Sequence, residues 1–252
     1  MLKRPSSSQS SAPVLAADLR NRLKEKFESQ RKPKIAEQMA KYLKNKYPFY
    51  GLKAPQRRQS AKSVIQHWQK ANAIQEISEN LARAVLCALQ GCKEREMHYV
   101  GAEFCTSLMR SGPVTPKFLS VVKLGVETHS WWDTVDIFAA SAMSPYLLKC
   151  GGGQPCQEIL KTMDSWSVSE NLWLRRTAIL CQMKLKSKTD LGRLTRYILQ
   201  NRKHPNFFVQ KAIGWALRHH AHYDPEWVRK FLVKHGSELS RLSHREASKH
   251  LK

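Results

Sequence analysis

Acidic residues are scarce in this sequence. Its 252 residues include 20 Asp and Glu against 43 Lys and Arg, which gives a formal net charge of +23 at pH 7. This imbalance disfavours a charge-neutral scaffold and favours a polyanionic partner. Nucleic acid fits best, although an anionic membrane surface or a ribosomal context can select the same balance.

Long hydrophobic runs and closely spaced cysteine pairs are also missing. No run of about 18 apolar residues occurs, so we expect no membrane-spanning helix. The six cysteines are scattered, and the nearest pairs, Cys87/Cys92 and Cys150/Cys156, lack the CxxC spacing of a zinc site. Without a recognisable signal peptide, they are typical of reduced intracellular thiols, so we predict no metal and residence in the nucleus or cytoplasm. A weak organellar targeting pattern near the N-terminus is interrupted by acidic residues.

The alternation typical of β-strands is absent, and apolar residues recur with helical period from Val14 onward. The sequence therefore predicts an all-α fold. The expected helices occupy 14–29, 35–46, 55–71, 74–90, 94–110, 116–127, 131–149, 155–164, 169–186, 190–201, 205–221, 224–235 and 243–251.

Longer helices recur at a nearly constant interval. Those expected to begin near residues 94, 131, 169 and 205 are separated by 37, 38 and 36 residues. This period is typical of paired-helix solenoids of the HEAT or armadillo type, in which equivalent helices line one concave wall. We expect residues 1–13, which are Ser-rich, to be a disordered basic tail, and residues 14–252 to form a single domain of such repeats.

The segment Ser-Trp-Trp-Asp-Thr-Val-Asp at 130–136 combines two indoles with two carboxylates at a helix start. Trp132 and Asp136 are four residues apart and would share one helix face. An aromatic plane beside a carboxylate suits a cationic ligand or a transition state that gains positive charge. A core tryptophan and a helix-capping aspartate would produce the same pattern.

The next two long helices place further polar and aromatic residues on the expected wall. LWLRR carries Arg176, and QKAIGWALR carries Trp215 and Arg218. Such groups are costly to bury without partners, so their alignment from repeat to repeat favours a ligand groove. Arg218 near its helix end could instead complement the helix dipole.

Five segments together resemble the AlkD-like DNA alkylation repair glycosylases. The resemblance covers roughly residues 15–252, and its motifs occur in the family's order: YLKNKYPFYGLKAPQRRQ, WWDTVD, NLWLRRTAIL, QKAIGWALR and LSHREASKHL. It implies a right-handed superhelical solenoid of HEAT-like repeats with a concave basic groove. The Gly151–Gly153 segment departs from the family pattern. It lies between the WWDTVD and LWLRR motifs, so it affects the expected geometry of that loop and none of the proposed site residues.

The resemblance also implies an activity, the excision of N3- and N7-alkylated purines such as 3-methyladenine and 7-methylguanine from double-stranded DNA. Asp136, Trp132 and Trp215 would form the catalytic cleft, Arg176 would hold the backbone near the lesion, and Tyr42 would contact DNA. Arg218 is a further candidate for DNA contact. The enzyme would act as a monomer without cofactor or metal, and the lesion would stay stacked rather than being flipped out.

The chemistry of cationic bases supports one catalytic carboxylate. An alkylated purine departs as a neutral base, so it needs little help from a general acid, and Asp136 alone could stabilise the charge on the sugar. Two other functions fit the same pattern. A catalytically silent nucleic-acid-binding protein would keep the basic groove and aromatics, and a solenoid scaffold could bind protein.

Overall fold

The computed structural model describes residues 11–251 and contains no β-strand in that range. The all-α prediction is confirmed. Contacts divide the chain between Cys105 and Thr106 into two compact units, each with its own buried core. Among the described residues, no helix combines the length and apolar character needed to cross a membrane. Residues 1–10 of the expected tail lie outside the described range, and the first helix already begins at Ala12.

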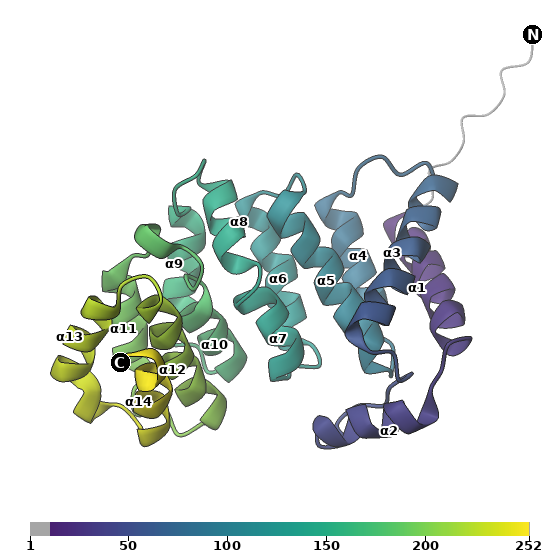
Figure 1. Cartoon of the computed structure of the whole chain (residues 1–252). Helices are drawn as coiled ribbons and strands as arrows, with labels where there is room; N and C mark the ends of the chain where they lie inside the picture. The colour runs from purple at the N-terminus through teal and green to yellow at the C-terminus, as the bar shows by residue number, and fades with distance from the viewer. Residues whose placement is uncertain (1–10, 252) are drawn as a thin grey trace, which may run out of the picture. The chain divides into compact units, whose positions relative to one another are not determined.

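The first unit is built from α1 (Ala12–Glu28), α2 (Pro33–Tyr42), α3 (Ala54–Ala71) and α4 (Glu79–Gln90), and α5 (Arg95–Ser111) runs from it into the second unit. Helix α1 packs against α3 and α4 (Figure 1). Its apolar face, Leu19, Leu23 and Phe27, is fully buried, and the Trp68 indole of α3 donates a hydrogen bond to the Leu15 carbonyl. The 3.6-residue period that predicted the helix therefore also formed the core.

A buried carboxylate organises the loop between α2 and α3. The side chain of Glu96 accepts hydrogen bonds from the backbone N–H groups of Tyr50, Gly51 and Leu52 at 2.8–3.0 Å. Burial raises the pKa of this carboxyl above its ordinary value, and the three donors oppose that rise. Gly51 has φ of 91°, and a Cβ there would lie 2.3 Å from the Lys32 carbonyl oxygen. The loop path therefore requires glycine.

The second unit contains the remaining helices. They are α6 (Leu119–Glu127), α7 (Trp132–Ala139), α8 (Met143–Cys150), α9 (Gln157–Trp166), α10 (Leu172–Leu180), α11 (Leu191–Asn201), α12 (Phe207–Ala221), α13 (Pro225–His235) and α14 (Arg241–Ala247). Helix α10 contacts both α7 and α12, and α12 contacts α14, so these four helices follow one another in a row. Helices α6, α9, α11 and α13 pack against members of this row. This pairing is consistent with a solenoid of helical repeats.

Three expected helices differ from the prediction by five residues or more at one end, and the one expected over 74–90 begins only at Glu79. The helix expected over 131–149 is two helices, α7 and α8, because Pro145 lacks the N–H needed to continue a single helix. The helix expected over 169–186 ends at Leu180. There the Ser144 hydroxyl donates to the Cys181 carbonyl and accepts from the Lys184 N–H, which holds the chain in a turn.

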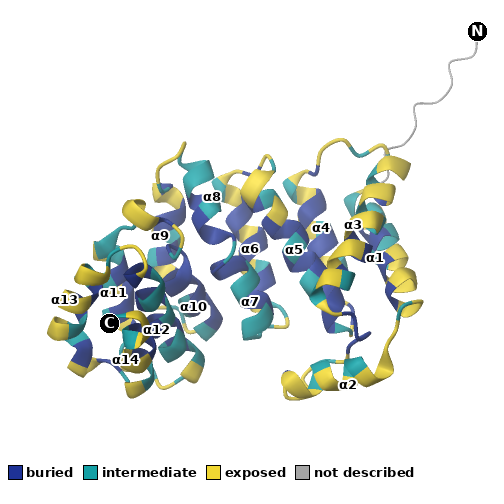
Figure 2. Cartoon of the chain, in the orientation of Figure 1, coloured by how far each residue is buried: buried dark blue, intermediate teal, exposed yellow. Residues whose placement is uncertain are grey.

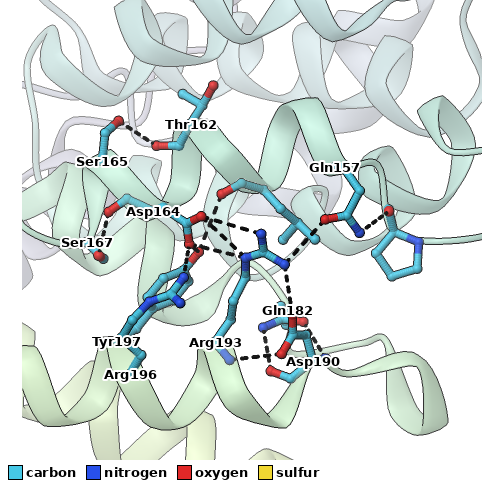
Figure 3. A network of polar contacts seen from close by, with 12 residues as sticks. Gln157, Thr162, Asp164, Ser165, Ser167, Gln182, Asp190, Arg193, Arg196 and Tyr197 are labelled. Atoms are coloured by element: carbon cyan, nitrogen blue, oxygen red, sulfur yellow. Dashed lines mark hydrogen bonds and ion pairs between the residues drawn. The ribbon is translucent and has the colours of Figure 1, made fainter.

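A polar network joins α9 to α11 (Figure 3). The Asp164 carboxylate accepts a hydrogen bond from the Tyr197 hydroxyl at 2.7 Å and pairs with Arg193 and Arg196. Although burial raises it, these hydrogen bonds hold the pKa of the Asp164 carboxyl below its ordinary value. Asp190 caps α11 and pairs with Arg193 at 2.8 Å. These arginines therefore connect helices of the second unit to one another.

The contact between α12 and α14 depends on Gly214. A Cβ at this position would lie 2.5 Å from the Glu246 Cβ and 2.7 Å from the Ser243 carbonyl oxygen. Replacing Gly214 with alanine should destabilise the protein by about 1–3 kcal/mol, because overpacking against backbone outweighs the better helix propensity of alanine. Chemical denaturation would measure this change. Gly91→Ala is the control, since its nearest atoms would be 3.6 Å away. Equal stabilities of the two variants would contradict the close packing.

Candidate active site

Helices α7, α10 and α12, which are neighbours in the row described above, carry the predicted site residues of the second unit. Their first residues, Trp132, Leu172 and Phe207, follow that of α5 at intervals of 37, 40 and 35 residues, close to the expected repeat. Asn171 and Asn206 start the second and third helices, since each side chain accepts a hydrogen bond from the backbone N–H two residues later, at 2.9 and 2.8 Å. Local sequence thus fixes where these two helices begin.

Asp136 and Arg176 form the central contact. The guanidinium donates from Nε to Oδ1 and from Nη2 to Oδ2 of the carboxylate, both at 2.7 Å. This two-bond geometry orients the carboxylate as well as attracting it. The side chains are 4% exposed for Arg176 and 16% exposed for Asp136, so the Asp136 side chain keeps a small exposed surface.

Burial raises the pKa of the Asp136 carboxyl above its ordinary value, and the hydrogen bonds and charge of Arg176 oppose this rise. The nearby charge of Asp133 adds to it. Removing a carboxylate from water disfavours its charged form, whereas the paired guanidinium favours it. Arg176 therefore supports an ionised Asp136 in a largely buried position.

Arg176 is itself held by α12. Its Nη1 donates to the Phe208 carbonyl oxygen at 2.6 Å, in addition to the two bonds to Asp136. The Phe208 ring lies 4.9 Å from the Trp131 ring and 5.1 Å from the Trp173 ring, measured between centroids. This aromatic cluster connects the first turns of α7, α10 and α12. Trp131 and Trp173 therefore have a packing role.

The two predicted site tryptophans lie on α12 and α7. The Arg176 Cζ is 5.7 Å from the centre of the Trp215 ring, within range of a cation–π contact. Trp132 is half-buried at the start of α7, one turn before Asp136 and on the same helix face. The structure thus brings Asp136, Arg176 and Trp215 together from three helices.

Arg218 has an acidic partner. Its Nη1 donates to a Glu246 carboxylate oxygen at 2.7 Å, and Lys249 pairs with the other oxygen at the same distance. The hydrogen bond from Lys249 is the main reason that the pKa of the Glu246 carboxyl lies below its ordinary value. The side chain of Arg218 is still 24% exposed. Its predicted contact with DNA therefore has to coexist with the bond to Glu246.

Tyr42 belongs to the first unit, where it ends α2 with 73% of its surface exposed. No residue of α2 is buried, and Figure 2 shows this helix as exposed or intermediate throughout. The basic segment that follows is different. Arg57 and Arg58 both bind the Glu103 carboxylate, at 2.7 and 2.8 Å, and Arg57 is nearly buried over the Tyr99 ring.

Comparison with known families decides the identity of the chain. The family model for DNA alkylation repair enzymes matches residues 23–251. The chain belongs to this family. A solved structure described as a predicted DNA alkylation repair enzyme from Enterococcus faecalis is similar, with a TM-score of 0.74 and 28% sequence identity. The alignment covers 88% of this chain and 96% of that protein. No curated protein sequence matches the chain.

Two residues that bind site arginines of this DNA alkylation repair enzyme were not predicted from the sequence. Phe208 acts through its backbone carbonyl, so no residue-type pattern could have identified it. Glu246 could have been noticed, because it is the only acidic residue between 241 and 252. Within residues 11–251, no group of three or more His, Cys, Asp or Glu is arranged to hold a metal ion.

Proposed function

We propose that this DNA alkylation repair enzyme is a monofunctional glycosylase for cationic alkylpurines. It hydrolyses the N-glycosidic bond of N3- and N7-alkylated purines in double-stranded DNA and leaves an abasic site. The observation that carries the proposal is the largely buried, partly exposed Asp136 side chain, whose carboxylate is held in a fixed orientation by two hydrogen bonds from Arg176. Membership of the DNA alkylation repair family supports alkylated DNA as the substrate.

The proposed chemistry needs one carboxylate. An alkyl group on N3 or N7 makes the purine cationic, so the base leaves as a neutral molecule when the bond to C1′ breaks. Positive charge then develops on C1′ and the ring oxygen of the sugar, where Asp136 stabilises it and orients the attacking water. The water oxygen bonds to C1′, and one proton is released. No cofactor enters this reaction.

The tryptophans supply electron-rich faces to the same site. Trp132 and Trp215 would contact the cationic base or the deoxyribose, and each such contact contributes about 0.5–2 kcal/mol. A site that recognises charge and sugar in this way has no need to enclose the base. We therefore include in the proposal that the lesion stays stacked and that bulky N7 adducts are accepted.

DNA binding in the proposal is electrostatic. Phosphate contacts by Arg176, Arg218 and Tyr42 would position the duplex without reading its sequence. Arg176 combines two roles, since its buried guanidinium holds Asp136 and would present its remaining N–H groups to the backbone. The net charge of +23 provides the attraction for the duplex as a whole.

A base-release assay tests the proposal. Purified protein should release 7-methylguanine and 3-methyladenine from alkylated duplex DNA, and it should cleave the strand only after alkaline treatment of the abasic site. Chromatography of the released bases and gel analysis of the strand would measure both products. Duplex carrying only neutral purines is the control. Binding without release at any enzyme concentration would favour a silent binder.

A further inference from the structure

A cavity of about 840 Å³ lies at the C-terminal end of the second unit, away from the Asp136 carboxylate. It is formed where α13 ends and α14 begins. Among its lining residues are Gly236, Leu239, Arg241, Leu242, His244 and Arg245. No acidic side chain lines this cavity, so its charged lining residues are cationic.

Arg241 and Arg245 lie one helical turn apart on the same exposed face of α14. Neither guanidinium forms a hydrogen bond, ion pair or ring contact with any described residue. Other arginines of this unit are committed, such as Arg176 to Asp136 and Arg218 to Glu246. The two lining arginines therefore keep their donors for an anionic ligand.

The rest of the lining adds a third basic group and an apolar surface. A Cβ on Gly236 would lie 3.1–3.2 Å from the His244 ring, so the imidazole packs directly on this glycine. Leu239 is nearly buried and Leu242 is half-buried. A cavity that combines guanidinium groups with aliphatic side chains matches a phosphate ester attached to a sugar or base.

The cavity is firmly connected to the candidate active site through α12. Helix α14 packs on α12 at Gly214, and the Ser243 hydroxyl donates to the Gln210 carbonyl at 2.7 Å. Gly214 directly precedes Trp215 in the sequence. A DNA strand bound at the cavity would therefore be positioned relative to the helix that carries Trp215.

We propose that this cavity binds a phosphate ester, and that its ligand is a phosphodiester of the duplex flanking the lesion. Arg241 and Arg245 donate to the phosphate oxygens, and Leu239 and Leu242 contact the adjoining sugar. The proposal rests on the proposed function, in that the enzyme acts on double-stranded DNA. It adds a second point of attachment that is separate from the catalytic carboxylate.

The test measures the affinity of Arg241→Ala, Arg245→Ala and the double variant for an undamaged duplex over a range of salt concentrations. Each single substitution should weaken binding about tenfold, equivalent to about 1.4 kcal/mol. Each should also reduce the salt slope by about one ion, the change expected for one phosphate contact. Because both side chains are exposed and unpartnered, the variants should keep the thermal stability of the wild type.

Lys234→Ala is the matched control, since it removes one exposed positive charge from neighbouring α13 outside the lining of the cavity. Arg241→Lys should retain part of the affinity because it keeps the charge. If Arg241→Ala and Lys234→Ala change affinity and salt slope equally, the effect is one of net charge and the cavity proposal is overturned.

A second arm separates the possible sources of the phosphate. The wild type and the double variant are titrated with deoxyadenosine 5′-monophosphate. Duplex binding that is unchanged in the variant, together with lost nucleotide binding, would overturn the duplex as the ligand and assign the cavity to a free nucleotide. Single-turnover base release by the wild type distinguishes this proposal from the proposed function. If the arginine variants bind duplex more weakly but the wild type releases no base, phosphodiester binding at the cavity is supported and the glycosylase activity is contradicted.

Discussion

Replacing Asp136 with asparagine should lower the single-turnover rate of base release by about 10²-fold or more. Asparagine keeps the size of the side chain and one acceptor for Arg176 but removes the negative charge that opposes the developing positive charge on the sugar. Affinity for undamaged duplex should persist, because the proposed phosphate contacts do not involve this carboxylate. Some residual release is expected, since cationic purines also leave spontaneously.

Asp133→Asn provides the matched control for this substitution. Asp133 lies in the first turn of the same helix, three residues before Asp136, and its charge raises the pKa of Asp136. Its substitution should leave base release close to the wild-type rate. Equal rates in Asp136→Asn and wild type, with intact folding and DNA affinity, would exclude the proposed mechanism.

Much of this site was predictable from the sequence because its elements are helical repeats. The spacing of four residues between Trp132 and Asp136 fixes a shared face on any helix. The repeat interval then places Arg176 and Trp215 on the next equivalent helices, so a one-dimensional pattern specifies which residues face the same way. This alignment is compatible with the ion pair between Asp136 and Arg176, but the pattern alone did not predict that these two residues would bind each other.

Polar contacts between residues of different helices or loops were not predictable in the same way. Arg218 binds Glu246 and Glu96 binds the loop at residues 50–52, and each contact joins segments that are 28 or more residues apart. Local period determines which face of a helix is apolar but not which charged group of another helix lies opposite. The same limit applies to Arg57, whose burial against Glu103 no local pattern indicated.

Helix ends differed from the prediction for two separate reasons. The break between α7 and α8 has a sequence cause in Pro145, and the Ser-Pro pair at 144–145 was a usable indication. The early end of α10 has a tertiary cause. The Ser144 hydroxyl of α8 donates to the Cys181 carbonyl and accepts from the Lys184 N–H. These side-chain bonds engage backbone groups that a continued helix would have used.

Replacing Arg176 with alanine should affect both stability and activity. It leaves the Asp136 carboxylate largely buried without its cation, a change that typically costs about 3–5 kcal/mol. For a protein of this size the Tm should fall by about 6–20 °C. Base release should also fall, because the carboxylate loses its orientation and its ionised form is disfavoured. If Arg176 also contacts phosphate, the salt slope of duplex binding should decrease by about one ion.

The pH dependence identifies the cause of the Arg176→Ala defect. Without the guanidinium, burial should raise the pKa of Asp136 further above its ordinary value, so the folded state holds a proton that the unfolded state releases. Stability of the variant relative to wild type should then decrease as pH rises through the raised folded-state pKa of the carboxyl, and it should recover as pH is lowered below that pKa. The acid limb of its residual base release should move to higher pH, since activity requires the ionised form.

Arg175→Ala separates this electrostatic effect from a general loss of packing. Arg175 is the preceding residue on α10 and bonds the Val168 and Ser169 carbonyls and the Asn201 side chain. Its removal should lower the Tm without shifting the acid limb of base release, because none of its hydrogen-bond partners titrates and its charge lowers the pKa of His204 rather than that of Asp136. A pH profile of Arg176→Ala that coincides with those of Arg175→Ala and wild type would show that Arg176 does not control the ionisation of Asp136.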